Sequence, residues 1–309
     1  MDFYFRVKAR QNKTRFRNGI FHKAAISDFF SGLSGTFYPE HDVILKYAYY
    51  YSYDSKGRLS TRKTPGRAIE YFIYDKLNRL FLYQNGNLRG INKWQYNKYD
   101  ALGRTIITGV GSCGAGLSLA ELQTSVENLP FVNEFLSAVD PMLNIGYTNN
   151  VMPELETSGE IQSVNYYDTY HILQKTGNKM YYKYVYGDDP DLKFVDPGNA
   201  SLSYYADTVN MTGKATCTRT LLVENGTNKW LFTVYYYDKY GRVIQIREKN
   251  HRSGYDVISM HYKGLTSDVD YTKHQQTATL GTNNYNHTEE NTNTYDHAGR
   301  LTQNRYKIN

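Results

Sequence analysis

The 309-residue sequence predicts an all-β fold built from hairpins. Three observations predict it: an excess of tyrosine, side-chain alternation over short segments, and a short turn pattern that recurs along the chain. The chain holds 32 tyrosines against 13 phenylalanines and 2 tryptophans. Tyrosine favours strands because its flat ring packs on a pleated surface, while its hydroxyl needs a polar partner or water. Rows of tyrosine therefore suit sheet faces that are half-buried or line a wet cavity.

Aromatic and apolar residues at alternate positions indicate where the strands lie. Four tyrosines occupy alternate positions in 46–53, and aromatic or apolar residues alternate in the same way in 181–186 and 230–237. A period of two over such spans is the pattern of a β-strand. Both faces of these segments carry aromatic residues, which favours a sheet covered on both sides or wrapped around a cavity.

The recurring pattern is Tyr-Asp-x-x-Gly-Arg, called here the YD turn. One copy has Asn in place of Gly, and a sixth copy, Tyr167-Asp168-Thr169-Tyr170, keeps only the first half. The residues predicted to form the five complete turns are Tyr53, Asp54, Gly57 and Arg58; Tyr74, Asp75, Asn78 and Arg79; Tyr99, Asp100, Gly103 and Arg104; Tyr237, Asp238, Gly241 and Arg242; and Tyr295, Asp296, Gly299 and Arg300.

The chemistry of the YD turn is that of a β-hairpin. The Asp side chain accepts hydrogen bonds from backbone amides a few residues on. Gly supplies the left-handed conformation that follows a type I turn, and Asn is the next best residue for positive φ. Tyr ends the incoming strand, and Arg opens the outgoing strand and covers a tyrosine ring of its neighbour. These residues are predicted as determinants of the fold, not as catalysts.

One region interrupts the hairpins. The stretch 109–116 is rich in glycine and predicts a loop, and Ser118 with Glu121 forms a capping-box pattern that starts a helix. The spacing of Phe131, Phe135 and Val139 predicts a second short helix. The polar stretches 187–198 and 275–294 are predicted as loops.

These features divide the chain into four parts. Residues 1–45 form a basic segment without assignment, and 46–110 form a first set of YD-repeat hairpins. A glycine-rich loop and a partly helical insertion follow at 111–160. Residues 161–309 form a second YD-repeat sheet region. The expected architecture is a curved or spiralling strip of sheet.

The YD turns resemble the YD repeats of RHS proteins, teneurins and the C components of insecticidal toxin complexes. The segments around Tyr74, Tyr99, Tyr167 and Tyr295 are similar to long RHS proteins of Bacteroides-type bacteria, and the resemblance covers roughly 50–309. It implies a sheet strip that spirals into a hollow shell, which in many members encloses a C-terminal toxin. The family's conserved core and toxin domain have no counterpart here, so the resemblance implies an interior shell segment.

Catalytic, cofactor and metal motifs are not predicted. No His or Cys cluster, nucleophile elbow or phosphate loop is present, and Cys113 and Cys217 lie far apart, although a disulfide between them stays open. Asp188, Asp189 and Asp191 crowd one loop, where a solvated acidic turn is favoured over a calcium site. We expect no enzymatic activity and no cofactor.

The net charge of +6 and the pI of about 8.9 do not by themselves indicate a nucleic-acid partner. The basic residues Arg6, Lys8 and Arg10 alternate as on the wet face of a strand, which we favour over phosphate contacts. No signal peptide and no membrane span are predicted. The sequence predicts a secreted or cell-surface location within a longer protein, or a cytoplasmic one for a chain that stands alone.

The predicted function is a structural shell segment that encloses or presents a polypeptide, with the rest of the shell as its partner. The alternative is a carbohydrate-binding adhesin module, in which exposed tyrosines stack on sugar rings. The direction in which the tyrosines point distinguishes the two.

Overall fold

The structure is a computed structural model. It describes residues 3–5, 13–16, 19–22, 49–137, 145–153, 155, 160–169, 171–176, 179–184, 211–224 and 226–308. The chain divides into two compact units. Unit 1 comprises Met1–Arg104, Thr108–Glu134 and Asn149–Leu155, and unit 2 comprises Thr105–Ile107, Phe135–Thr148 and Glu156–Asn309.

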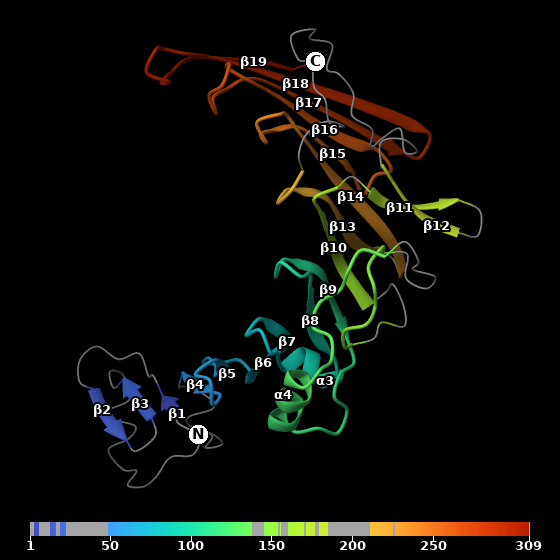
Figure 1. Cartoon of the computed structure of the whole chain (residues 1–309). Helices are drawn as coiled ribbons and strands as arrows, with labels where there is room; N and C mark the ends of the chain where they lie inside the picture. Colours follow the sequence, from blue (N-terminus) through green and yellow to red (C-terminus); the bar gives the residue numbers. More distant parts are fainter. Residues whose placement is uncertain are drawn as a thin grey trace. The chain divides into compact units, whose positions relative to one another are not determined.

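The first part of the chain, coloured blue to green in Figure 1, contains nine strands and two helices in the described residues. They are β1 (Phe3–Phe5), β2 (Lys13–Phe16), β3 (Gly19–His22), β4 (Tyr50–Tyr53), β5 (Leu59–Lys63), β6 (Glu70–Tyr74), β7 (Leu80–Gln84), α3 (Gly86–Gly90), β8 (Trp94–Tyr99), β9 (Thr105–Gly111) and α4 (Leu119–Glu127).

The remaining described elements are all strands and belong to unit 2. They are β10 (Ile161–Tyr167), β11 (His171–Thr176), β12 (Lys179–Tyr184), β13 (Ala215–Glu224), β14 (Thr227–Tyr237), β15 (Val243–Lys249), β16 (Tyr255–Tyr262), β17 (Val269–Leu280), β18 (Asn283–Tyr295) and β19 (Leu301–Ile308).

The all-β prediction is confirmed. One sheet contains fifteen of the described strands, in the order β1-β4-β5-β6-β7-β8-β9-β10-β13-β14-β15-β16-β17-β18-β19. Two further pairs, β2-β3 and β11-β12, stand apart from it. From β13 to β19 each strand pairs with the next in antiparallel register, as Figure 1 shows within unit 2. A meander of this kind needs only short turns between neighbouring strands.

Unit 1 buries residues on both faces of its sheet. Ile73, Leu82 and Tyr96 lie opposite one another across β6, β7 and β8 and are at most 1% exposed. Phe72 and Phe81, which point to the other face, are also buried. Each such side chain contributes about 1.5–3 kcal/mol by leaving water. Aromatic alternation therefore builds a sheet whose two faces are both covered in this part.

A row of buried residues crosses four of the strands of unit 2. Cys217, Val234, Arg247 and Val257 are paired in register from β13 to β16, and all four are buried. Burial fades toward the last strand, since every described residue of β19 is exposed.

Of three expectations about local structure, one is confirmed and two are wrong. The helix predicted from Ser118 is confirmed as α4, with both hydrogen bonds of its capping box present. The second helix is wrong, because residues 131–137 form an irregular segment in which Leu136 makes an isolated bridge to Tyr147. The loop predicted at 275–294 is also wrong, because most of it belongs to β17 and β18.

A short helix, α3, was not predicted. Asn85 accepts a hydrogen bond from the Leu88 amide and caps it. Several predicted features lie outside the described residues: the basic residues 6–10, the acidic turn at 188–191 and the loop at 187–198.

Candidate functional site

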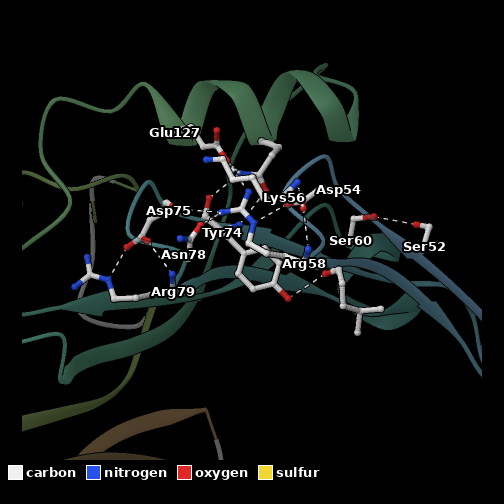
Figure 2. A network of polar contacts seen from close by, with 12 residues as sticks. Ser52, Asp54, Lys56, Arg58, Ser60, Tyr74, Asp75, Asn78, Arg79 and Glu127 are labelled. Atoms are coloured by element: carbon white, nitrogen blue, oxygen red, sulfur yellow. Dashed lines mark hydrogen bonds and ion pairs between the residues drawn. The ribbon is translucent and has the colours of Figure 1, made fainter. Parts of the chain in front are cut away.

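The YD turns all have one internal geometry, which the first copy illustrates (Figure 2). The Asp54 carboxylate uses Oδ1 to accept hydrogen bonds from the amides of Lys56 and Arg58, both at 2.9 Å. Its Oδ2 accepts a hydrogen bond from Arg58 Nε at 2.6 Å. The Gly57 amide donates to the Asp54 carbonyl, and the Asp54 amide donates to the Arg58 carbonyl. The turn therefore satisfies its own polar groups.

The same bonds recur in all five complete turns. The Arg amide lies 2.8–2.9 Å from Asp Oδ1, and Arg Nε lies 2.6–2.7 Å from Asp Oδ2. The fourth turn position has positive φ in each copy: Gly57 75°, Asn78 64°, Gly103 79°, Gly241 76° and Gly299 75°. Strand register shifts at Tyr53, Tyr74, Tyr237 and Tyr295, so each of these turns includes a β-bulge.

The first two YD turns also hold the hairpin that follows them. The guanidinium carbon of Arg58 lies 4.9 Å from the centre of the Tyr74 ring, and that of Arg79 lies 4.4 Å from the Tyr99 ring. The two tyrosine hydroxyls donate to the carbonyls of Leu59 and Leu80, the residues that follow those arginines. Cation–π contact and hydrogen bond together fix one hairpin on the next.

Tyr262 plays the same part in unit 2 although no YD turn follows it. Its ring lies 4.5 Å from the Arg242 guanidinium carbon, and its hydroxyl donates to the Val243 carbonyl at 2.7 Å. Its spacing of twenty residues from Arg242 matches that from Arg79 to Tyr99. That spacing is the signal that could have identified it from the sequence.

The incomplete sixth copy is completed by residues far along the chain. The Gly213 amide donates to Asp168 Oδ1 at 2.6 Å, and the Asp168 amide donates to the Lys214 carbonyl at 3.0 Å. Lys214 takes the place of the arginine, with its Nζ 5.7 Å from the centre of the Tyr237 ring. The segment between Asp168 and Gly213 is thus inserted within a YD turn. The sequence pattern missed this turn because its two halves are separated.

A second layer of contacts comes from residues 118–134 of unit 1, called here the covering segment. In Figure 2 its helix α4 lies over the first two YD turns. Gln123 Oε1 accepts a hydrogen bond from the Tyr74 amide, and its Nε2 donates to the Tyr74 carbonyl. The side-chain amide of Gln123 thereby satisfies the backbone of the bulged tyrosine, as a neighbouring strand would.

Charged contacts join α4 to the first turn. Glu127 Oε1 lies 2.5 Å from Arg58 Nη2 and 3.0 Å from Lys56 Nζ (Figure 2). The hydrogen bond from Arg58, with that from Lys56, lowers the pKa of Glu127 below its ordinary value. Glu127 therefore stays ionised and paired at neutral pH.

The covering segment continues along the second and third turns. Arg79 donates to the Val132 carbonyl at 2.8 Å and to Asn133 Oδ1 at 3.0 Å. Lys76 Nζ donates to the Leu129 carbonyl, and the Glu134 amide donates to the Tyr99 carbonyl at 2.9 Å. Three successive YD turns are thus bonded to one segment that is distant from them in sequence.

The covering segment ends at a buried cluster beside β8. Lys98 Nζ lies 3.0 Å from Glu134 Oε1 and 2.9 Å from Asn149 Oδ1. The side chains of Lys98 and Glu134 are both fully buried. Glu134 also accepts hydrogen bonds from the amides of Asn150 and Val151. A buried pair is sustained by further hydrogen bonds of this kind.

A polar network also crosses the sheet of unit 1. Glu70 accepts hydrogen bonds from Arg62 Nε and the Tyr83 hydroxyl, both at 2.6 Å. The bond from Arg62 lowers the pKa of Glu70, and burial together with the bond to Glu70 raises the pKa of Tyr83. Arg62, Glu70 and Tyr83 are each hydrogen-bonded to another side chain of the three, which suits a structural role.

Reactive groups are scarce in the described part. There, no group of three or more His, Cys, Asp or Glu side chains is placed to hold a metal ion. Cys113 and Cys217 are not joined, so the disulfide left open by the sequence does not form, and burial raises the pKa of the Cys217 thiol. No described helix combines the length and apolar character that crossing a bilayer requires.

No protein-family model and no curated protein matches the chain. Among solved structures, the chain is similar to one titled "Crystal Structure of TcdB2-TccC3-TEV", at 13% identity and a TM-score of 0.19. The match covers 87% of this chain and 16% of that chain, so this chain spans well under two thirds of its length.

Proposed function

We propose that the chain is a non-enzymatic structural segment of an RHS/YD-repeat shell, which encloses or presents a polypeptide. The observation that carries the proposal is the repeated turn, in which Asp and Arg bond to each other and Arg then covers the tyrosine of the next hairpin. This arrangement adds one hairpin to the previous one with the same local contacts at Arg58, Arg79 and Arg242. Such repetition suits a wall that extends along the chain.

The location of the tyrosines supports a shell wall over the alternative of a carbohydrate-binding adhesin. Among the tyrosines whose side chains the structure describes, Tyr240, Tyr285 and Tyr306 are exposed and the others are buried or half-buried. Sugar recognition by stacking needs open ring faces, whereas all but three of these rings are at least partly covered by other residues. A secreted or cell-surface location belongs to the same proposal.

The direct test is a structure of the product of the complete gene that contains this chain. Single-particle electron microscopy should show the outer edge of β19 paired with a further strand, and polypeptide density against one face of the sheet. A free β19 edge on a separate domain with nothing enclosed would contradict the proposal.

A glycan array tests the alternative on the same protein. We expect no glycan to bind in a way that depends on tyrosine. Binding that is lost on Tyr285→Ala and Tyr306→Ala, and kept in the matched strand variant Gln303→Ala, would replace the shell proposal with the adhesin.

A further inference from the structure

The fully buried side chains of Lys98 and Glu134 meet the half-buried side chain of Asn149, which brings an amine, a carboxylate and a carboxamide into contact. We propose that Lys98 and Asn149 join in an intramolecular amide bond between their side chains, with Glu134 as the catalytic proton carrier. This modification would stand whether or not the chain is a shell segment, because it rests on unit 1 alone.

The distances place the two reacting groups together. Lys98 Nζ is 2.9 Å from Asn149 Oδ1, so the amine is within hydrogen-bonding distance of the carboxamide that it would attack. The same nitrogen is 3.0 Å from Glu134 Oε1, a carboxylate oxygen that can accept its proton. Reacting groups held in contact by a fold react as if at very high concentration.

Other bonds fix the geometry of the acceptor. The Leu155 amide donates to Asn149 Oδ1 at 3.2 Å, and Asn149 Nδ2 donates to the Leu155 carbonyl at 3.1 Å. The first of these bonds points at the oxygen on which negative charge develops during attack, as the donors of an oxyanion hole do. The Asn150 and Val151 amides hold the Glu134 carboxylate in place.

Burial favours the reaction. The side chains of Lys98 and Glu134 have no exposed surface, and an ammonium and a carboxylate away from water are costly as ions. Transfer of one proton from Lys98 Nζ to Glu134 gives a neutral amine and a carboxylic acid. The amine then has the free electron pair that a nucleophile needs.

The step balances without an oxidant or cofactor. The Lys98 nitrogen attacks Asn149 Cγ, and the carbonyl electron pair moves to Oδ1. Glu134 carries a proton from the attacking nitrogen to Nδ2, the Cγ–Nδ2 bond breaks, and ammonia leaves. The departing ammonia takes the remaining proton from Glu134 as ammonium, which restores the carboxylate. One Nζ–Cγ amide bond replaces one Cγ–Nδ2 bond.

The bond would join β8 to the segment that follows the covering segment. It would close a covalent loop from Lys98 to Asn149, which contains α4 and the covering segment that bonds to three YD turns. Closing a loop of this length reduces the freedom of the unfolded chain. The covering segment could then not leave the turns by simple unfolding of its end.

Mass spectrometry of the purified full chain under denaturing conditions tests the proposal. We expect a mass lower than that of the sequence by one ammonia molecule. After tryptic digestion, residues 94–104 should remain joined to residues 105–175, without cleavage after Lys98. A protein of full mass that is cleaved after Lys98 would overturn the proposal, as would loss of ammonia with normal cleavage there, which would indicate a cyclic imide.

Variants test which side chains form the proposed amide bond. Asn149→Asp should lose water in place of ammonia, while Asn149→Ala and Glu134→Gln should keep full mass, with circular dichroism used to confirm that each variant folds. Asn165→Ala serves as a matched control and should still lose ammonia. A linked peptide pair that persists in Asn149→Ala would assign the bond to other residues and overturn the proposal.

Discussion

The second and the last YD turn have the same internal bonds but different surroundings. In both, Arg Nε lies 2.7 Å from Asp Oδ2. The side chain of Arg79 is 15% exposed and that of Asp75 is fully buried, whereas Arg300 is 76% exposed and Asp296 is 19% exposed. Arg79 also covers Tyr99 and bonds to the covering segment.

This difference distinguishes the geometry of the turn, which the repeat sequence determines, from the stability of the turn, which depends on its surroundings. Turn geometry is local, since it forms in the exposed copy as well as in the buried one. Stability comes from the next hairpin and from the covering segment, because an exposed ion pair contributes little. The predictions below distinguish these two contributions.

The largest effect is expected for Asp75→Ala. It removes a buried carboxylate that accepts bonds from the Leu77 amide, the Arg79 amide and the Arg79 side chain. Breaking one partner of a buried pair costs about 3–5 kcal/mol of unfolding free energy. Urea unfolding measures it, and Asp296→Ala is the matched control with a much smaller shift. Equal shifts for the two variants would contradict the comparison.

Gly103→Val should cost about 3 kcal/mol, because a β-branched residue is strained at positive φ. Gly103 has φ 79°, and an added Cβ would meet only Arg79 Cδ at 4.0 Å, so the cost is conformational and not a clash. Gly103→Asn is the control and should be tolerated, since Asn78 occupies the same position with φ 64°. An unchanged denaturation midpoint for Gly103→Val would disprove this turn geometry.

Gln123→Ala tests the covering segment. It leaves the Tyr74 amide and carbonyl without their side-chain partner, and an unsatisfied buried group costs about 1–3 kcal/mol. The exposed neighbour Thr124, changed to Ala, should leave the unfolding free energy nearly unchanged. Similar values for the two variants would show that the covering segment does not stabilise the second turn.

The smallest effect concerns pH. Arg62 and Tyr83 lower the pKa of Glu70 in the folded chain. A lowered pKa gives stability that is present above the unfolded value of about 4.3 and is lost as pH falls through the folded value. Glu70→Gln should therefore flatten the decline of stability below about pH 4.

Glu289 is the control for that measurement. Its pKa is also lowered, first by the hydrogen bond from His287, but its side chain is 34% exposed, against 5% for that of Glu70. Glu289→Gln should leave the acid limb of the stability profile unchanged. A larger flattening for Glu289→Gln than for Glu70→Gln would contradict the assignment of acid sensitivity to the buried network.

The sequence predicted the parts of this fold that depend on neighbouring residues. Asp, Gly and Arg within five positions determine a YD turn, and Ser118 with Glu121 determines the start of α4. Contacts between segments that are distant along the chain could not be predicted from the sequence. Nothing in the pattern shows that Gly213 completes the turn begun by Asp168, or that Gln123 bonds to Tyr74.

Amino-acid composition gave a wrong prediction where strand pairing determines the structure. Residues 275–294 are rich in Asn and Thr, which favour loops, yet β17 and β18 pair over ten consecutive positions from Tyr271 with Thr292 to Leu280 with Asn283. Helical spacing likewise failed at Phe131 and Phe135, because the intervening Glu134 bonds to β8 residues and both rings are exposed.

Native-state hydrogen exchange of the full chain tests the central claim most directly. It compares the amides of Asn78 and Arg79 with those of Gly299 and Arg300, which make the same bonds within their turns. The account predicts that the covered amides exchange only through large-scale unfolding and the exposed ones through local opening. Equal protection of the two turns would show that the repeat stabilises itself without the covering segment.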